Sequence, residues 1–287
     1  MIIATITDRL GNQLFQYATA KALAVRNKTK VKINTNFYDS NAQYKASYEL
    51  DNFCIPQIFA SKNDLYKYMW PSDNIIYRIL RQIYPKHTYF EKSNCYDNNI
   101  EKLGDKVALR GFWQSYKYFD SIRPILIKEF KIKNTLNELN QSLATDIKKT
   151  NSVSLHIRRG DYVANQNFNN LYGTCSLEYY QTAIQIISNQ VEHITIFCFS
   201  DDIPWVKKNL NIDIPCIFID HNVGDKSYLD IHLMSLCKHN IIANSSFSWW
   251  GAWLNQNNEK IVIAPKKWYN DTTKNTKDLC PPNWLRI

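Results

Sequence analysis

This 287-residue chain lacks any regular spacing of its cysteines. The seven cysteines are scattered and odd in number, and no C-x-x-C pair occurs. Neither a disulfide framework nor a zinc site is therefore indicated, and a reducing compartment is the simplest expectation. Long apolar runs are also missing, and the apolar start breaks after six residues with no basic segment before it. We therefore expect neither a membrane span nor a signal peptide, which favours a cytoplasmic protein.

Glycine, proline and low-complexity sequence are scarce as well. Seven glycines and nine prolines stand against 45% hydrophobic and 14% aromatic residues, a balance typical of an ordered globular protein. The length fits one large domain or two of roughly 140 residues, and we favour two. The polar stretch 134–149 predicts the boundary, giving domains of residues 1–140 and 141–287.

Positive charge is concentrated in the first half of the chain. Residues 1–150 carry 23 Lys and Arg against 14 Asp and Glu, a net charge of +9, whereas residues 151–287 carry 12 of each kind. A basic half predicts a surface that meets an anionic partner, such as nucleic acid, a membrane leaflet or a phosphorylated acceptor. Because the lysines are scattered, a merely solvated surface is the alternative.

The second half alternates between strand-like and helical periods. This alternation predicts an α/β fold with a parallel sheet wound by helices, whose ligands bind at the carboxyl ends of the strands. Strands are expected at 152–157, 193–199, 216–219, 240–243 and 260–264. Polar segments follow the first four of them, at 158–161, 200–202, 220–221 and 244–248.

The first half opens with a strand–loop–helix–strand unit over residues 2–33. Asn12 and Gln13 lie at the start of its helix, where backbone N–H groups favour an anion or a polar ligand. Further on, the spacing predicts helical structure over 61–84, a strand over 107–113 and a helix over 122–130.

The segment 156–161 (HIRRGD) follows the first strand of the second half. In a period-two strand, His156 and Arg158 point to the face opposite the apolar residues, so that one face packs and the other can meet a ligand. An arginine fork offers fixed donors to phosphate or carboxylate. The alternative is a strand-end salt bridge between Arg158 or Arg159 and Asp161.

No two aspartates are separated by a single residue. This absence disfavours a metal-dependent enzyme of nucleotide sugars and favours neutralisation of a diphosphate by arginine. The segment 244–250 (NSSFSWW) adds hydroxyls and helix N-terminal amides, although Ser246 or Ser248 could instead only cap that helix. The tryptophans are expected in the core. Asp201 and Asp202 could contact a base or ribose, or cap the next helix.

Three segments, 11–18 (GNQLFQYA), 156–162 (HIRRGDY) and 244–251 (NSSFSWWG), together resemble glycosyltransferase family 11, the α-1,2-fucosyltransferases of the bacterial type. The segment 228–235 (YLDIHLMS) is also similar to α-1,6-fucosyltransferases, which share the arginine motif. The resemblance implies a GT-B-like fold, with two Rossmann-like domains facing a cleft. The C-terminal domain, a doubly wound parallel sheet, would hold most of the donor.

The resemblance further implies metal-independent, inverting transfer of L-fucose from GDP-β-L-fucose to the 2-hydroxyl of a galactoside glycan, as in O-antigen or surface glycan biosynthesis. No cofactor is expected. Arg158 would hold the β-phosphate, His156 the nucleotide and Asp230 the guanine. Without the resemblance, Asp230 would be a solvated or capping carboxylate early in a helix. The remaining donor-contacting residues would be Ser245, Ser246, Phe247, Asn12 and Gln13.

The acceptor hydroxyl needs a base. Asp161 is the first candidate because it shares the arginine loop, Asp202 is the second, and assistance by the departing phosphate is the third. Family members commonly carry a Gly-rich turn before the Asn-Gln pair, where this chain has Asp8 and Arg9. The path of that loop is therefore not predicted.

Two other classes of protein would use part of this pattern. A protein O-fucosyltransferase would share the donor machinery but would be expected to carry a secretory signal and disulfides. A non-catalytic nucleotide- or RNA-binding protein would use the basic half for phosphates, but it would not require donor residues at four successive strand ends. We therefore expect no nucleic-acid partner. The basic half is expected to approach a lipid-linked oligosaccharide at the anionic inner face of a membrane.

Overall fold

The structure is a computed structural model that describes residues 1–40, 46–69, 75–76, 79 and 87–287. The chain divides into two compact units, residues 1–131 with 277–279 and residues 132–276 with 280–287. The boundary expected after residue 140 would fall inside helix α6 (Glu138–Lys149). The observed division comes before this helix because α6 packs against α11 (Tyr228–Leu236) of the second unit.

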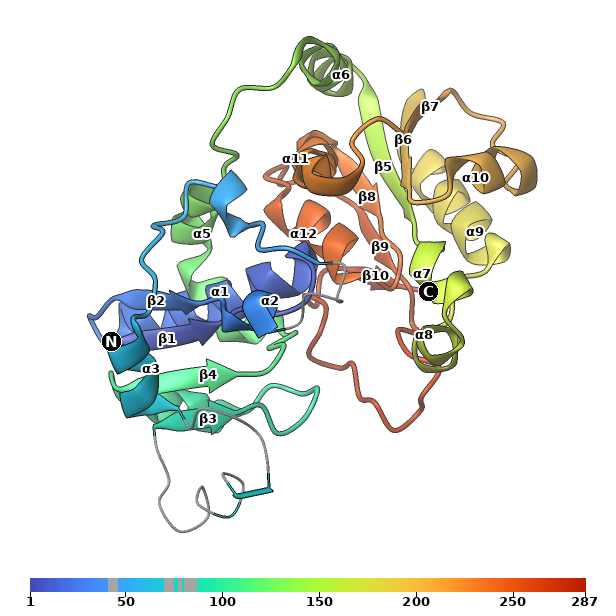
Figure 1. Cartoon of the computed structure of the whole chain (residues 1–287). Coiled ribbons are helices and arrows are strands. Elements are labelled where there is room, and N and C mark those ends of the chain that lie inside the picture. The colour runs from blue at the N-terminus through green and yellow to red at the C-terminus, as the bar shows by residue number, and fades with distance from the viewer. Residues whose placement is uncertain (41–45, 70–74, 77–78, 80–86) are drawn as a thin grey trace. The chain divides into compact units, whose positions relative to one another are not determined.

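The first unit is built on a four-stranded parallel sheet in the order β2-β1-β4-β3. Figure 1 shows α1 (Leu10–Arg26) and α5 (Arg123–Glu129) along one side of this sheet. On the other face, Ile3 and Ala108 pack against Tyr68 of α3 (Lys62–Tyr68). The strands are β1 (Ile2–Thr5), β2 (Val31–Asn34), β3 (Thr88–Phe90) and β4 (Val107–Arg110), and a short helix α2 (Asn36–Ser40) follows β2.

Two predicted elements of this unit are longer than the observed ones. The helix expected over 61–84 is described as α3, and much of its remainder lies outside the described residues. The strand expected over 107–113 stops at Arg110 because the next backbone N–H groups turn to a side chain. The carboxylate of Glu91 accepts from the N–H of Phe112 at 2.7 Å and from that of Trp113 at 2.9 Å. Trp113 then takes a left-handed φ of 58°.

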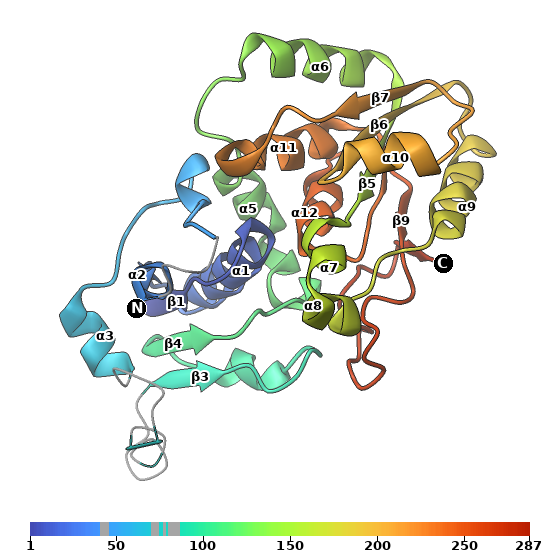
Figure 2. The ribbon, with the colours of Figure 1, turned by 45° about the vertical axis from the view of Figure 1, so that its right-hand side comes forward.

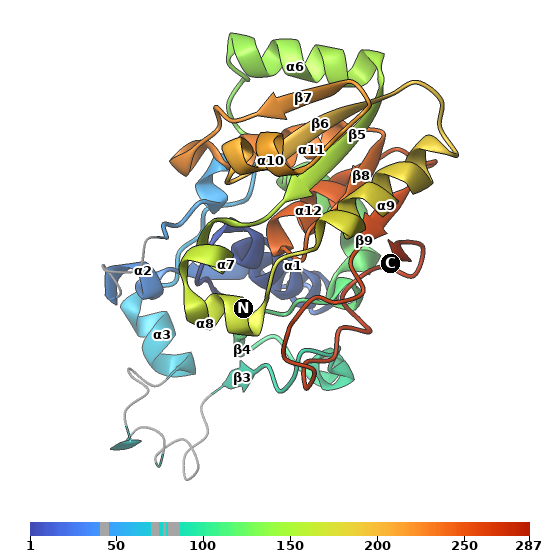
Figure 3. The same cartoon turned by 90° about the vertical axis from the view of Figure 1, so that its right-hand side faces the viewer.

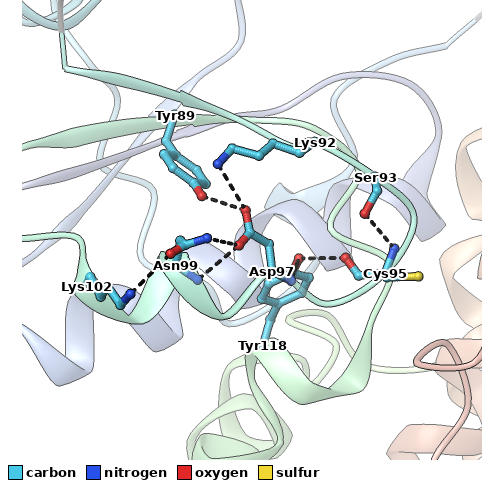
Figure 4. Close-up of polar contacts among 8 residues, drawn as sticks. All are labelled: Tyr89, Lys92, Ser93, Cys95, Asp97, Asn99, Lys102 and Tyr118. Atoms are coloured by element: carbon cyan, nitrogen blue, oxygen red, sulfur yellow. Dashed lines mark hydrogen bonds and ion pairs between the residues drawn. The ribbon is translucent and has the colours of Figure 1, made fainter.

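A polar cluster around Asp97 fixes the segment that follows β3 (Figure 4). One oxygen of Asp97 accepts from the Tyr89 hydroxyl at 2.6 Å, and the other accepts from the backbone N–H of Asn99 at 3.0 Å. The backbone N–H of Asp97 donates to Tyr118. The Tyr89 hydrogen bond is the largest influence on the pKa of Asp97, which is lowered. Every hydrogen bond in the cluster joins neighbouring segments of the first unit, so its role is structural.

The second unit contains a six-stranded sheet in which all neighbouring strands are parallel. From one edge to the other, the order is β7-β6-β5-β8-β9-β10, which in chain order is the 3-2-1-4-5-6 arrangement of a doubly wound Rossmann sheet. The predicted α/β class and the doubly wound C-terminal sheet are therefore confirmed. The strands are β5 (Asn151–Ile157), β6 (Ile194–Ser200), β7 (Cys216–Ile219), β8 (His239–Ile241), β9 (Val262–Ala264) and β10 (Leu285–Arg286).

Helices cover both faces of this sheet. In Figure 1, α9 (Leu177–Ser188) and α10 (Ile203–Asn209) lie on one side, and α11 and α12 (Ser246–Leu254) lie on the other. Figure 3 shows α9 and α10 in front of the strands. The buried face of β5, including Val153 and Leu155, packs against α9 and α10. In Figure 2, α7 (Gly160–Ala164) and α8 (Gln166–Leu171) follow the carboxyl end of β5.

The tryptophans of α12 lie in the core, as the sequence predicts. Trp249 and Trp250 are completely buried, and Trp249 stacks on Trp253 with ring centroids 6.2 Å apart. Gly251 permits α12 to approach α11, because a Cβ there would lie 2.7 Å from that of Met234. Among the described residues, no helix is long and apolar enough to cross a membrane.

Candidate functional site

The order of the strands creates a switch point between β5 and β8. The chain leaves β5 toward β6 on one side of the sheet, and it leaves β8 toward β9 on the other. Ligands of doubly wound folds bind outside the carboxyl ends of the strands at such a point. Because the sheet is parallel, the four predicted polar segments lie at one edge, and those after β5 and β8 flank the switch point.

The arginine loop after β5 is held by Asp201, which follows the last residue of β6. One oxygen of Asp201 lies 2.9 Å from Nη1 of Arg158, and the other accepts from the backbone N–H of Arg159 at 2.8 Å. A Cβ at Gly160 would lie 2.6 Å from the same carboxylate, so the glycine permits this close approach. Arg158 is therefore fixed in position by a carboxylate with which an anionic ligand would compete.

Arg159 has a different environment. Its guanidinium lies 3.5 Å from the ring centroid of Trp205, and its Nε lies 3.5 Å from an oxygen of Asp202. The other oxygen of Asp202 accepts from the N–H of Trp205 and caps α10, as the sequence allowed. The arginines thus have partners from the β6 end. The side chain of Asp161, the expected ion-pair partner and first candidate base, lies outside the described part of the structure.

His156 is buried directly behind this loop. It is 4% exposed, and its ring centroid lies 5.7 Å from that of Phe247 in α12. Burial is the largest influence on the pKa of His156, which is lowered to about 4; the charge of Asp201 raises it and the smaller effect of Arg158 lowers it. The imidazole is therefore neutral near pH 7. Its Nδ1 has no hydrogen-bond partner among the described residues.

The segment after β8 combines capping with exposed polar groups. Ser245, rather than Ser246 or Ser248, caps α12, because its Oγ accepts from the N–H of Phe247 at 3.3 Å. Ser245 and Ser248 are buried, whereas Ser246 and Phe247 are partly exposed. The Tyr162 hydroxyl donates to the carbonyl of Asn244 at 3.2 Å. The loops after β5 and β8 are thus joined.

Asp230 lies in the first turn of α11 and is largely enclosed. Its Oδ1 accepts from the side-chain amide of Asn222 at 2.8 Å. Burial raises the pKa of Asp230 to about 7, against the smaller lowering effect of the Asn222 hydrogen bond. No cation pairs with this carboxylate in the described structure. Strongly perturbed acids of this kind are typical of functional sites.

In the first unit, Asn12 belongs to a chain of side-chain hydrogen bonds at the ends of β1 and β4. Its amide nitrogen donates to Asp8 at 2.7 Å, and its oxygen accepts from Gln114 at 2.7 Å. Gln13 is fully buried. Its two amide hydrogens go to the carbonyls of Asp8 and Ser47, so the structure gives Gln13 the role of fixing this loop.

The loop that replaces the family's Gly-rich turn has a left-handed residue. Asp8 has a φ of 66°, a conformation that Asp tolerates better than most residues. Its carbonyl accepts from Gln13 and Tyr38, and its side chain accepts from the N–H of Arg9. These hydrogen bonds hold the loop in a turn where glycine would be the usual residue.

The structure thus brings together His156, Arg158 and Phe247 in the second unit, with Ser245 and Ser246 on the adjoining loop. It joins Asp230 to a separate group of amides. Asp201, Trp205, Gln114 and Asn222 were not predicted to hold these residues. Only Asp201, at a strand end, carried a signal in the sequence. No group of three or more His, Cys, Asp or Glu suited to a metal occurs among the described residues, and metal independence stays a prediction.

His156→Gln should change how stability depends on pH. A neutral buried histidine binds fewer protons when folded than when unfolded, so wild type should lose stability as the pH falls from about 6.5 to about 4. The variant should gain on wild type by up to about 1 kcal/mol per pH unit in that window. Urea unfolding at several pH values measures this.

Asp230→Asn provides the control with the opposite sign. The raised pKa of Asp230 means that the folded state binds more protons than the unfolded state between 3.8 and about 7. Wild type should therefore gain on this variant as the pH falls. Parallel pH profiles for wild type and His156→Gln would contradict the assignment of a buried neutral histidine.

Comparison with known proteins places the whole chain in one family. The model of glycosyl transferase family 11 matches residues 1–287. An alpha-1,2-colitosyltransferase of Escherichia coli is 36% identical over 100% of this chain and 99% of its own length. The O-antigen biosynthesis glycosyltransferase WbnK of Escherichia coli is 32% identical over 98% and 99%. The galactoside 2-alpha-L-fucosyltransferase SEC1 of Bos taurus is 23% identical over 86% and 62%.

Solved structures support the fold. Fucosyltransferase NodZ from Bradyrhizobium matches with a TM-score of 0.53 at 10% identity, over 87% of this chain and 91% of its own. A mutant of Arabidopsis thaliana FUT1 in complex with GDP matches with a TM-score of 0.54 at 10% identity, over 92% and 70%. The expected GT-B-like fold with two Rossmann-like domains is thereby confirmed. With a family model that matches from the first residue to the last, the chain belongs to glycosyltransferase family 11.

Proposed function

We propose that the protein transfers L-fucose from GDP-β-L-fucose to the 2-hydroxyl of a galactoside glycan, with inversion and without a metal ion. The observation that carries the proposal is the position of Arg158, which Asp201 holds at the switch point of the six-stranded sheet. Family membership supplies the reaction class. The galactoside 2-alpha-L-fucosyltransferase among the relatives supports both the donor sugar and the linkage.

The main chemical problem is the charge that builds on GDP as the glycosidic bond breaks. In our proposal, Arg158 binds the β-phosphate, with Asp201 giving up part of its contact when the phosphate arrives. His156, neutral at pH 7, contributes an uncharged contact to the nucleotide. Preorganised donors of this kind stabilise a developing anion more strongly than water can. The other diphosphate contacts are assigned to Ser245, Ser246 and Phe247.

The base of the donor is assigned to Asp230. Guanine presents two adjacent donors, its N1–H and its 2-amino group, and a carboxylate accepts from both. Asn12 of the first unit is proposed as a further donor-contacting residue, on the strength of the family resemblance. Gln13 is assigned an indirect role, since its amide hydrogens already go to backbone carbonyls.

The acceptor hydroxyl loses its proton during transfer. Asp161 stays our first candidate base because it shares the arginine loop. Asp202 is weaker, since its carboxylate already caps α10 and lies near Arg159. Assistance by the departing phosphate is the third route.

A second candidate donor sugar is colitose, favoured by the 36% identity to an alpha-1,2-colitosyltransferase. Colitose is L-fucose without its 3-hydroxyl, so both sugars fit the same reaction and the same nucleotide contacts. A direct comparison of GDP-fucose with GDP-colitose separates the two. A turnover with GDP-fucose far below that with GDP-colitose would make colitose the natural donor sugar.

Incubation with GDP-fucose and a panel of galactosides should release GDP and give a product whose α-1,2 linkage is read by NMR. Arg158→Ala should lower turnover by roughly 10²–10³, because it removes a donor that stabilises the leaving group. Arg26→Ala, whose guanidinium contacts the Ile100 carbonyl of the first unit, is the control and should retain activity. Near-normal turnover of Arg158→Ala would contradict the mechanism. If the enzyme transferred fucose only to protein hydroxyls, the assignment of a galactoside as acceptor would be wrong.

The affinity for GDP should fall as the pH falls below about 7. Only the ionised Asp230 accepts both guanine donors, and its pKa is raised to about 7. If the ionised form alone binds, the dissociation constant should rise about tenfold between pH 8 and pH 6. Isothermal titration measures this. The phosphate of GDP also titrates near pH 6, so Asp230→Asn is the control, and an unchanged profile in that variant would refute the assignment.

We also propose that the basic N-terminal half, residues 1–150, brings the enzyme to a lipid-linked acceptor at an anionic membrane surface. The support is the net charge of +9 in residues 1–150. Binding to vesicles that contain anionic lipid should weaken as salt is raised. Co-sedimentation that depends on neither anionic lipid nor salt would dismiss this contact and leave the transfer reaction untouched.

A further inference from the structure

We propose that the buried amide pair Asn140–Asn222 is a positioning device that aims the carboxylate of Asp230 at the 2-amino edge of guanine. The inference rests on the proposed function, which assigns guanine to Asp230. It adds two residues, from α6 and from the loop after β7, that act on the base only through that carboxylate. Their removal should weaken the selection of guanine over a purine that lacks the 2-amino group.

The pair is closed by reciprocal hydrogen bonds. The amide nitrogen of Asn140 donates to the oxygen of Asn222 at 3.0 Å, and that of Asn222 donates to the oxygen of Asn140 at 2.9 Å. Asn140 is fully buried and Asn222 is 7% exposed. Buried side-chain amides held by each other in this way have little freedom to turn.

Every amide hydrogen of the pair has an assigned acceptor. The second hydrogen of Asn222 goes to Oδ1 of Asp230 at 2.8 Å, and the second hydrogen of Asn140 goes to the Asn137 side chain at 2.8 Å. Nε2 of His221 lies 3.1 Å from the oxygen of Asn140. An end-for-end flip of Asn222 would point an oxygen at a carboxylate, so the network permits one orientation only.

This arrangement fixes Asp230 from one side. Asn222 contacts Oδ1, and Oδ2 has no hydrogen-bond partner in the part of the chain that the structure describes. A carboxylate bound at one oxygen by a rigid neutral donor keeps its rotamer, and its other oxygen remains available to a second set of donors. The guanine edge supplies that set, because its N1–H and 2-amino group are adjacent.

The three residues lie far apart in the sequence and are assembled by the fold. Asn140 lies in the first turn of α6, whose cap is Asn137. Asn222 follows the edge strand β7, and Asp230 opens α11, against which α6 packs. The first helix of the second unit thus supports the proposed base site.

The experiment compares GDP with IDP, which differs only in lacking the 2-amino group. Isothermal titration at pH 8, where Asp230 is ionised, should show wild type binding GDP more tightly by about tenfold, the value of one charge-assisted hydrogen bond. Asn222→Ala should bring the two affinities close to equality. Asn140→Ala should reduce the ratio less, since it acts one residue further away, and it serves if Asn222→Ala does not fold.

The control is Asn255→Ala. Asn255 is a buried asparagine of the same unit whose amide donates to the Cys237 carbonyl and to Asn240, each at 2.7 Å. Its loss should destabilise the fold while leaving the GDP-to-IDP ratio unchanged. In an Asp230→Asn background, Asn222→Ala should no longer affect the ratio, as expected of a residue that acts through Asp230.

Two outcomes would overturn the inference, and they are distinguishable. Equal binding of GDP and IDP by wild type would remove both the guanine assignment and this inference. A wild-type preference that persists in Asn222→Ala and Asn140→Ala would overturn the positioning role alone. Fucosyl transfer, assayed separately with a galactoside, reports on the proposed reaction independently of both.

Discussion

The contact between Asp201 and the arginine loop is the constraint on which the polar edge of the second unit depends. The carboxylate holds the loop through both the backbone of Arg159 and the side chain of Arg158. It can reach both because β5 and β6 are adjacent and parallel and end at the same level, with Ile157 paired to Ser200. The glycine at 160 follows from the same contact, since a side chain there would meet Asp201. A cation held in advance needs little reorganisation when an anion arrives.

The residue behind this ion pair is a neutral histidine. His156 is buried beneath the loop, and burial is the main reason that its imidazole stays neutral, since the charge of Asp201 acts against that of Arg158. The site therefore presents one permanent cation and one neutral ring. Arg159, in contrast, contacts the ring of Trp205 and the carboxylate of Asp202. Two adjacent arginines in the sequence thus have different contacts, which their order along the chain alone does not reveal.

The local sequence pattern predicted many of the strands and core residues of the second unit, but few of the partners of its polar side chains. The periods of apolar residues located β5 and β7 within about one residue. The Trp-rich segment was correctly expected in the core. These features depend on neighbours in the sequence. The partners of Arg158 and Asp230 depend instead on segments that sheet order and helix packing bring together. The hydrogen bonds of Asn222, for example, join it to Asp230, 8 positions away, and to Asn140, 82 positions away.

The first unit shows the same limit. The sequence correctly predicted β1, β2 and α1, but it extended β4 to Trp113 and did not predict the hydrogen bonds by which Gln13 fixes the loop before α1. The carboxylate of Glu91 accepts from the N–H groups of Phe112 and Trp113 just beyond β4, and the Asp8 and Ser47 carbonyls occupy the amide hydrogens of Gln13. Each outcome is decided by a tertiary hydrogen bond, which outweighs local propensity.

Asp201 and Asp230, two carboxylates of the second unit, are held by partners of different charge. Asp201 faces a cation, and the ion pair keeps an arginine in place. Among the described residues, the hydrogen-bond partner of Asp230 is a neutral amide. A lysine or arginine beside Asp230 would lower its pKa and satisfy it, and its pull on further N–H donors would weaken. An amide fixes the side chain without neutralising it, and burial raises the pKa of the carboxyl to about 7 because the Asn222 hydrogen bond offsets only part of the cost of burying the charge. A carboxylate left in this state is suited to select a ligand by its hydrogen-bond donors, whereas Arg158 is suited to bind one by its negative charge.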